Sequence, residues 1–329
     1  MRLSSSVFLL AGLLAAWPVA ATGQVSSKPV IGFLHAQSSG PSDLEVAKFR
    51  EGLNEEGYVE GRNVVIEYRW GNNDPSTLPA LAADLVQHRV AVIVTAGGLV
   101  AARAAKAATS TIPIVFVTGL DPAENGFVAS LNRPGGNATG VVNYNRELVA
   151  KRLELLRELV RPATKIAYLM NADDTNLGTG ARRQIEEEKN TANRLMQLVL
   201  YAKSEDQIAA SFAAAARQGI GAMLVASDPF LSDRRDLLLA LAAQYALPAG
   251  YQRREFAEAG GLMSYGPRRA DALRQAGGYA GKILKGGDPA EMPVLIPTKI
   301  DLVINLKTAK TLGLSVPASL LVSADQLIK

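Results

Sequence analysis

The sequence has 329 residues, of which 48% are hydrophobic and 20% charged, a balance typical of folded globular proteins and unlike that of disordered chains. This length exceeds one minimal domain and suits two domains of ordinary size. The formal charge is +4, but acidic and basic residues are interspersed, so no block of like charge indicates a nucleic-acid partner.

Residues 1–23 have the pattern of a secretion signal. Arg2 gives a positive start, Val7 to Ala16 is apolar, and small residues suited to cleavage follow up to Gly23. A membrane anchor is the alternative, but a spanning helix needs about 20 apolar residues and this run is shorter. The sequence has no cysteine, which excludes disulfides and a lipid-modified cysteine. We therefore expect a secreted, periplasmic protein without a lipid anchor.

Strand and helix patterns alternate through the first half of the remaining chain. Short apolar runs predict strands, and longer runs with one apolar face predict helices. The expected strands are 30–34, 63–70, 90–94 and 112–117, and the expected helices are 43–56, 78–87 and 99–108. Because strands and helices alternate, the economical arrangement is a parallel sheet covered by helices.

The second half repeats this order. The expected strands are 165–169, 197–201, 222–225, 247–251, 262–265 and 302–304, and the expected helices are 182–196, 206–218, 232–245 and 269–285. Ile31 corresponds to Ile166 at an offset of 135 residues, and Ile112-Pro113 corresponds to Leu247-Pro248 at the same offset. The pattern favours an internal duplication of one α/β unit, and two unrelated α/β domains are the alternative.

Two such units in series need a junction, and Gly135 to Asn145 leads out of the first one. We expect a first lobe of residues 29–145 with about 262–287, and a second lobe of 146–261 with about 296–329. Several chain crossings between the lobes would form a hinge. The cleft between the lobes is then the expected binding site.

Ligands of open α/β sheets bind at the carboxyl ends of the strands, which selects the short polar loops that follow the predicted strands. The candidate ligand-binding residues in these loops are His35, Gln37, Gly97, Gly98, Thr118, Asp121, Asn171, Asp228 and Tyr251. Tyr144 joins them from the predicted junction, and Ser264 and Tyr265 join them from the predicted strand 262–265.

Gly97 and Gly98 come directly before a predicted helix. A helix amino terminus carries free N–H groups and a partial positive charge, so a ligand carboxylate could dock there. A plain strand-to-helix turn is the alternative. Asp121 and Asp228 could hold a ligand ammonium group, or could serve as turn or cap residues. The three tyrosines could form flat walls with a polar edge, or could belong to the core.

Motifs for catalysis, cofactors and metals are missing. No Gly-x-Ser-x-Gly nucleophile elbow occurs, no Gly-x-Gly-x-x-Gly follows the first strand, and no Walker loop is present. Two histidines without cysteine make a poor transition-metal site. We expect no enzyme activity, no cofactor and no metal.

Several stretches together resemble a known family. They include Phe49-Arg50-Glu51-Gly52-Leu53, Ile112-Pro113-Ile114-Val115-Phe116, Asn132-Arg133-Pro134-Gly135-Gly136-Asn137, Gly260-Gly261-Leu262-Met263-Ser264-Tyr265-Gly266 and Ile304-Asn305-Leu306-Lys307-Thr308-Ala309. With these stretches the chain resembles the ABC-transporter substrate-binding proteins related to the tryptophan/tyrosine-binding type, which have the type I periplasmic-binding fold. The resemblance covers nearly all of the chain after the signal.

The resemblance implies two similar Rossmann-like lobes that close on a small solute and deliver it to the permease subunits of an ABC importer. It implies a monomer whose ligand is an amino acid, an aromatic acid or a related organic acid. Gly97, Gly98 and Thr118 would hold the carboxylate, Asp121 or Asp228 the amine, and His35 and Gln37 would line the cleft. A ligand-sensing domain of a membrane receptor and a secreted α/β hydrolase remain as alternatives. A sugar-type repressor would need an amino-terminal helix-turn-helix, and the secretion signal occupies that position.

Overall fold

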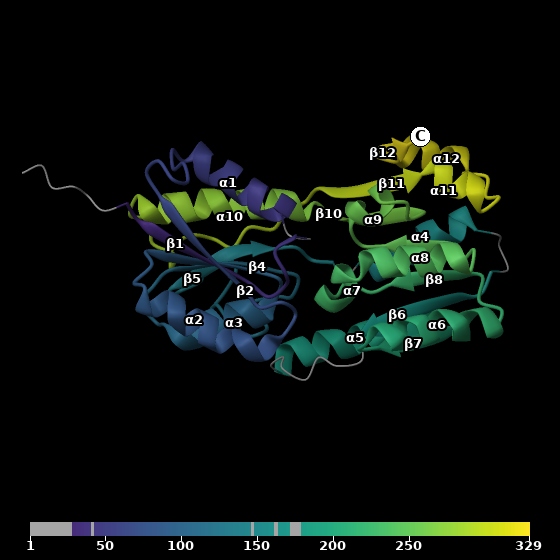
Figure 1. Ribbon diagram of the computed structural model, residues 1–329, viewed down its shortest axis with the longest axis horizontal. Helices are drawn as coiled ribbons and strands as arrows, with labels where there is room; N and C mark the ends of the chain where they lie inside the picture. Colours follow the sequence, from purple (N-terminus) through teal and green to yellow (C-terminus); the bar gives the residue numbers. More distant parts are fainter. Residues whose placement is uncertain (1–27, 41–42, 146–147, 161–163, 172–178) are drawn as a thin grey trace, which may run out of the picture.

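A computed structural model describes residues 28–40, 43–145, 148–160, 164–171 and 179–329. They form two α/β lobes side by side, each with its own sheet (Figure 1). The secretion signal expected at 1–23 lies outside the described residues. No helix in the described ranges is long and apolar enough to cross a membrane.

The first lobe has a parallel sheet with the strand order β2-β1-β3-β4-β5. Its strands are β1 (Val30–His35), β2 (Val65–Trp70), β3 (Val92–Ala96), β4 (Ile114–Thr118) and β5 (Ala138–Val142). α2 (Leu78–Gln87) and α3 (Leu99–Ala108) pack on one face, with the short 3-10 helix η2 (Pro75–Thr77) before α2. α1 (Asp43–Glu55) and α10 (Arg269–Leu284) pack on the other face.

The second lobe has a larger sheet with the order β12-β11-β10-β9-β8-β6-β7, in which β10 and β11 run antiparallel. Its strands are β6 (Ile166–Asn171), β7 (Leu198–Ala202), β8 (Ala222–Val225), β9 (Ala249–Tyr251), β10 (Met263–Pro267), β11 (Ile300–Asn305) and β12 (Gln326–Ile328). Its helices are α4 (Val149–Leu159), α5 (Thr179–Leu195), α6 (Glu205–Arg217), α7 (Pro229–Asp233), α8 (Arg235–Gln244), α9 (Arg254–Glu258), α11 (Leu306–Thr311) and α12 (Ala318–Ser323).

Two regions differ from the sequence expectation in an instructive way. β5 was expected to be junction, because a glycine inside a short run weakens a strand pattern, yet Gly140 packs where an added Cβ would lie 2.0 Å from the carbonyl oxygen of Phe116. The helix expected at 232–245 is divided into α7 and α8 at Arg234. α7 begins earlier because Asp228 caps it and Pro229 occupies its first turn.

The lobe boundary near residue 268 also needs a correction. The sequence placed 262–287 in the first lobe as one block. β10 instead pairs with β9 and β11 of the second sheet, whereas α10 packs against α1 of the first lobe. The chain therefore changes lobes at Arg268. Sequence patterns identify a strand but not its pairing partner, which explains the error.

α1 and α10 approach each other closely at two glycines. A Cβ on Gly52 would lie 1.7 Å from the carbonyl oxygen of Arg274, and one on Gly277 would lie 2.1 Å from that of Phe49. Only glycine permits this contact between helix backbones. The packing fixes the first turns of both helices beside each other, and these turns carry Glu45 and Arg269.

Candidate functional site

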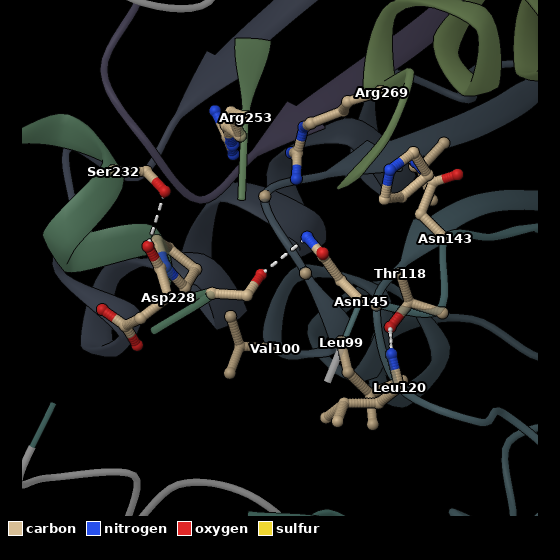
Figure 2. A pocket seen from close by; sticks show the side chains of 17 residues that line it. Leu99, Val100, Thr118, Leu120, Asn143, Asn145, Asp228, Ser232, Arg253 and Arg269 are labelled. Atoms are coloured by element: carbon tan, nitrogen blue, oxygen red, sulfur yellow. Dashed lines mark hydrogen bonds between the residues drawn. The ribbon is translucent and has the colours of Figure 1, made fainter. Parts of the chain in front are cut away.

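A cavity lies between the two lobes at the carboxyl ends of their strands (Figure 2). From the first lobe it is lined by residues 97–100, 117–120, Asn143 and Asn145. From the second lobe and the hinge it is lined by 227–229, Ser232, Arg253, Pro267 and Arg269. Its empty space is about 870 Å³ when the open solvent at its mouth is included.

The amino terminus of α3 forms one part of the wall. Gly97 and Gly98 have φ values of 85° and 105°, which favour glycine, and Gly98 provides no side-chain cap. The first N–H groups of a helix have no acceptor within the helix. Leu99 and Val100, the first two helical residues, line the cavity. This wall therefore offers backbone donors and a partial positive charge.

Two arginines form another part of the wall. Arg253 follows β9, and Arg269 is the first residue of α10. Figure 2 shows their guanidinium groups on the same side of the site, across from Leu99 and Leu120. Burial, followed by the like charge of Arg269, lowers the pKa of Arg253, although arginine remains protonated in proteins.

Glu45 on α1 contacts both arginines and does not itself line the cavity. Its Oε1 lies 2.5 Å from Nε of Arg269 and 3.6 Å from Nη1 of Arg253. Burial alone would raise the pKa of Glu45, but the charge of Arg269, the hydrogen bond with His35 and the charge of Arg253 hold it well below its usual range. Glu45 is therefore ionised, and it links α1 of the first lobe to Arg253 of the second.

His35 supports Glu45 as a neutral imidazole. Its Nδ1 accepts the backbone N–H of Gln37 at 2.9 Å, so the ring proton sits on Nε2, which donates to Oε2 of Glu45 at 3.1 Å. Burial is the main reason that the pKa of His35 is lowered, against the opposing effect of Glu45. His35 lies inside the first lobe, where it orients Glu45.

We expect the free energy of unfolding to fall as the pH is lowered from 7.5 to 4. The pKa of His35 is lower in the folded protein, so the unfolded chain binds its proton first, and stability is lost below about pH 6.5. The lowered pKa of Glu45 stabilises the fold above the unfolded value of about 4.3, and this stabilisation is lost below it. Urea denaturation at several pH values measures both losses of stability.

His35→Gln should flatten the pH dependence of the free energy of unfolding between pH 7.5 and 5. The loss of stability at lower pH should remain. His88→Gln is the matched control, because His88 is exposed at the end of α2. An unchanged slope in His35→Gln would contradict the role given to His35.

Four of the expected site residues line the cavity: Gly97, Gly98, Thr118 and Asp228. Thr118 closes its loop by accepting the backbone N–H of Leu120 at 3.1 Å (Figure 2). Asp228 caps α7 by accepting the N–H of Leu231 at 3.0 Å, and Asn171 donates to its other oxygen at 3.2 Å. Asn171 thus contacts Asp228 and is not among the lining residues.

Asp121 and Tyr144 pair with each other outside the cavity lining. The Asp121 carboxylate accepts the backbone N–H groups of Ala123 at 2.8 Å and Glu124 at 3.0 Å, and the Tyr144 hydroxyl at 2.7 Å. Asp121 thus organises the loop after β4, the turn role that the sequence left as its alternative.

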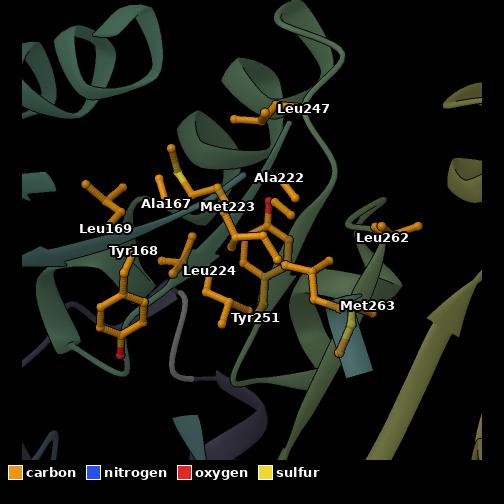
Figure 3. Packing of buried hydrophobic residues seen from close by; sticks show 14 of the residues in the cluster. Ala167, Tyr168, Leu169, Ala222, Met223, Leu224, Leu247, Tyr251, Leu262 and Met263 are labelled. Carbon is orange, nitrogen blue, oxygen red and sulfur yellow. The ribbon is translucent and has the colours of Figure 1, made fainter. Parts of the chain in front are cut away.

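Tyr251, Ser264 and Tyr265 lie in the second lobe, outside the cavity lining. Tyr251 is fully buried, stacks on Phe256 at a ring distance of 4.5 Å, and belongs to the core (Figure 3). Ser264 is buried in β10. Tyr265 packs against the same core, and its backbone oxygen accepts from Arg152.

Gln37 contributes to an interlobe contact beside the cavity. Its Nε2 donates to the backbone oxygen of Pro229 at 3.1 Å and to the carboxylate of Asp233. Asn73 donates to the other oxygen of Asp233. We call Gln37, Asn73 and Asp233 the interlobe latch, because the first two lie in the first lobe and Asp233 ends α7 of the second.

Sequence reasoning missed Arg253, Arg269, Asn143 and Asn145. Arg253 stood in a loop selected by the strand-end rule, but arginine is common on surfaces and nothing local set it apart. Arg269 carried only the signal of a helix start. Asn143 and Asn145 were treated as junction, and in the structure Asn145 donates to the Ser227 hydroxyl of the other lobe at 3.0 Å. Within the described ranges, no group of three or more His, Cys, Asp or Glu residues could hold a metal ion.

The model of the family described as ABC transporter substrate binding protein matches residues 34–328. The chain belongs to this family. The resemblance inferred from the sequence is confirmed, as are the two α/β lobes with parallel sheets and the role in binding a solute. The family is one of substrate-binding proteins.

Individual relatives agree with this membership. The chain is 27% identical over 273 residues to a tyrosine-binding protein of Clostridioides difficile (strain R20291), covering 82% of this chain and 77% of the relative. An ABC domain from Streptococcus pneumoniae in complex with L-Trp is 27% identical, with a TM-score of 0.80, over 92% of this chain and all of that one. A conserved domain protein from Vibrio cholerae is 25% identical, with a TM-score of 0.79 and the same coverage.

Proposed function

We propose that this substrate-binding protein works in the periplasm as a monomer, captures a small carboxylate-bearing solute between its lobes, and delivers it to the permease of an ABC importer without chemical change. The observation that carries the proposal is the convergence of polar groups from both lobes on one cavity. The α3 amino terminus and Thr118 come from the first lobe, and Arg253 comes from the second.

The relatives support an amino-acid-like solute. One is named for tyrosine, and another was solved with L-Trp, and both ligands carry a carboxylate and an apolar body. The cavity offers hydrogen-bond donors for the carboxylate at the α3 amino terminus. It offers apolar contacts for the body of the ligand at Leu99, Val100 and Leu120.

Lobe closure couples binding to delivery. A ligand shifts a two-state equilibrium only by binding the closed form more tightly than the open form. Groups on opposite lobes meet the ligand together only in the closed form. The interlobe latch adds polar contacts that form in the same arrangement.

Native mass spectrometry of protein purified from its own periplasm tests the proposal, followed by calorimetry with the solutes found and by small-angle scattering. We expect one solute per chain and a smaller radius of gyration when it binds. A broad metabolite panel without any binder, or a scattering profile that no solute changes, would refute the proposal. Turnover of the solute would favour an enzyme instead.

Asp233→Asn should open the unliganded lobes and weaken solute binding about ten-fold, because the latch loses its charged acceptor. Asp236→Asn is the matched control, since Asp236 is exposed at the start of α8 and pairs only with its neighbour Arg235 in the part of the chain that is described. Scattering and calorimetry measure the two effects. Equal behaviour of the two variants would mean that the latch does not bias closure.

A further inference from the structure

The charged groups of the cavity are mainly positive. Arg253 and Arg269 both line it, and among the lining residues that the structure describes Asp228 is the single acid. Glu45 lies behind the arginines and not in the lining. The lining itself therefore holds two guanidinium groups and one carboxylate, while Glu45, Glu255 and Asp233 act on Arg253 from outside the lining. A lining with more positive than negative groups favours an anionic ligand group.

Arg269 has donor capacity to spare. Glu45 Oε1 lies 2.5 Å from its Nε as an ion pair, but both Nε and Nη2 are buried and have no hydrogen-bond partner in the described residues. A buried donor without an acceptor is destabilising. Arg253 lies 3.6 Å from the same Glu45 oxygen, beyond hydrogen-bonding distance. A ligand carboxylate between the two guanidinium groups would satisfy donors that Glu45 leaves open.

Asp228 is poorly placed to bind an ammonium group. One of its oxygens accepts the capping N–H of Leu231, and the other accepts from Asn171. These two bonds hold the carboxylate in the orientation that caps α7. In Figure 2 its carboxylate lies at the outer edge of the site, away from Arg269 and Asn143. Asp121, the other expected amine partner, is outside the lining and already accepts three hydrogen bonds.

The rest of the wall is apolar or neutral. Leu99, Val100 and Leu120 lie across from the two arginines in Figure 2. Asn143 is more than nine-tenths buried, lines the cavity, and its Oδ1 has no partner among the described residues. This oxygen is an acceptor, so it needs a donor such as a ligand hydroxyl or ammonium group, whereas a keto oxygen would need the amide N–H group.

We infer that the solute is an apolar monocarboxylate whose charge is recognised by Arg253 and Arg269, and whose binding does not depend on an α-ammonium group. The class comprises 2-hydroxy, 2-oxo and unsubstituted acids with an aromatic or branched body. The inference rests on the proposed function and narrows it. The arginine pair recognises the negative charge of the ligand, and no residue is assigned to a ligand ammonium group.

Calorimetry at pH 7.5 with matched ligands tests the inference. Each set shares one side chain: L-phenylalanine, 3-phenyllactate, phenylpyruvate, 3-phenylpropanoate and the neutral 3-phenylpropanamide, with a parallel leucine-derived set. We expect at least one deaminated acid in a set to bind as tightly as its amino acid or more tightly, and the amide to bind at least ten-fold more weakly than the acid. Two results would overturn the inference while leaving the proposed function intact. One is an amino acid that binds more than ten-fold tighter than every deaminated twin, and the other is binding only of solutes outside both sets.

Arg253→Gln should lower acid binding by about ten- to hundred-fold and reduce the ratio of acid to amide affinity. Arg217→Gln is the control, because Arg217 is exposed on α6. Arg269→Gln combined with Glu45→Gln gives a second test in which Arg269 and Glu45 lose their charges together, while Arg253 keeps the nearby carboxylates of Glu255 and Asp233. An acid-to-amide ratio that stays at the wild-type value in both variants would also overturn the inference. The failure of every small molecule to bind the wild-type protein would instead refute the proposed function.

Discussion

Glu45→Gln is expected to lower the free energy of unfolding by about 3–5 kcal/mol, the usual cost of removing one partner from a buried ion pair. Glu45 is buried beside Arg269, Arg253 and His35. Without its charge the two arginines lose the carboxylate that lies against both of them. Urea denaturation followed by circular dichroism measures the loss.

The same substitution should open the lobes. Arg269 and His35 belong to the first lobe, so their contacts with residue 45 persist in any arrangement, whereas Arg253 comes from the second lobe. Moving Arg253 away relieves the repulsion. We expect a larger radius of gyration by small-angle scattering.

Glu51→Gln is the matched control on the same helix. Glu51 forms an exposed ion pair with Lys48 at 2.6 Å, and such surface pairs contribute less than about 1 kcal/mol. If Glu45→Gln were as stable as this control, the buried carboxylate would not be the element that holds the two arginines.

Arg152→Met is expected to destabilise the protein by about 3 kcal/mol and to loosen the hinge. Arg152 on α4 is 2% exposed. It donates to the backbone oxygen of Asn145 at 2.7 Å and to that of Tyr265 at 2.7 Å. These acceptors lie on two different chain segments that approach the lobe boundary. Methionine fills much of the space but leaves both carbonyls without this donor, at about 1–3 kcal/mol for each buried group.

Denaturation and scattering together distinguish the two effects of this substitution. Arg157→Met on the same helix is the control, because Arg157 is exposed and, within the described residues, its side chain makes a single hydrogen bond, to the Leu195 carbonyl. We expect the control to differ from wild type by less than about 1 kcal/mol. A stable Arg152→Met protein with unchanged scattering would show that the hinge does not need this guanidinium group.

Gly97, Gly98 and Thr118 lie in the cavity lining and Asp121 does not, for a physical reason. Gly97, Gly98 and Thr118 lie in the cavity wall because glycine before a helix and a residue at a strand end are placed by local geometry. Asp121 has the same kind of sequence position, but its carboxylate bonds the N–H groups of its own turn. An aspartate after a strand can bind a ligand or close a turn, and only the surrounding backbone decides between them.

The sequence by itself determined the alternation of strands and helices, the two similar lobes and the loops at the strand ends, because these depend on hydrophobic periodicity and local turn chemistry. The tertiary structure decided that β10 joins the second sheet and α10 the first lobe. It also brought Glu45, Arg253 and Arg269 together from three distant segments. Long-range pairing of charges leaves no local pattern, because the partners are far apart in the sequence and their pairing offsets a desolvation cost that arises only when folding buries them.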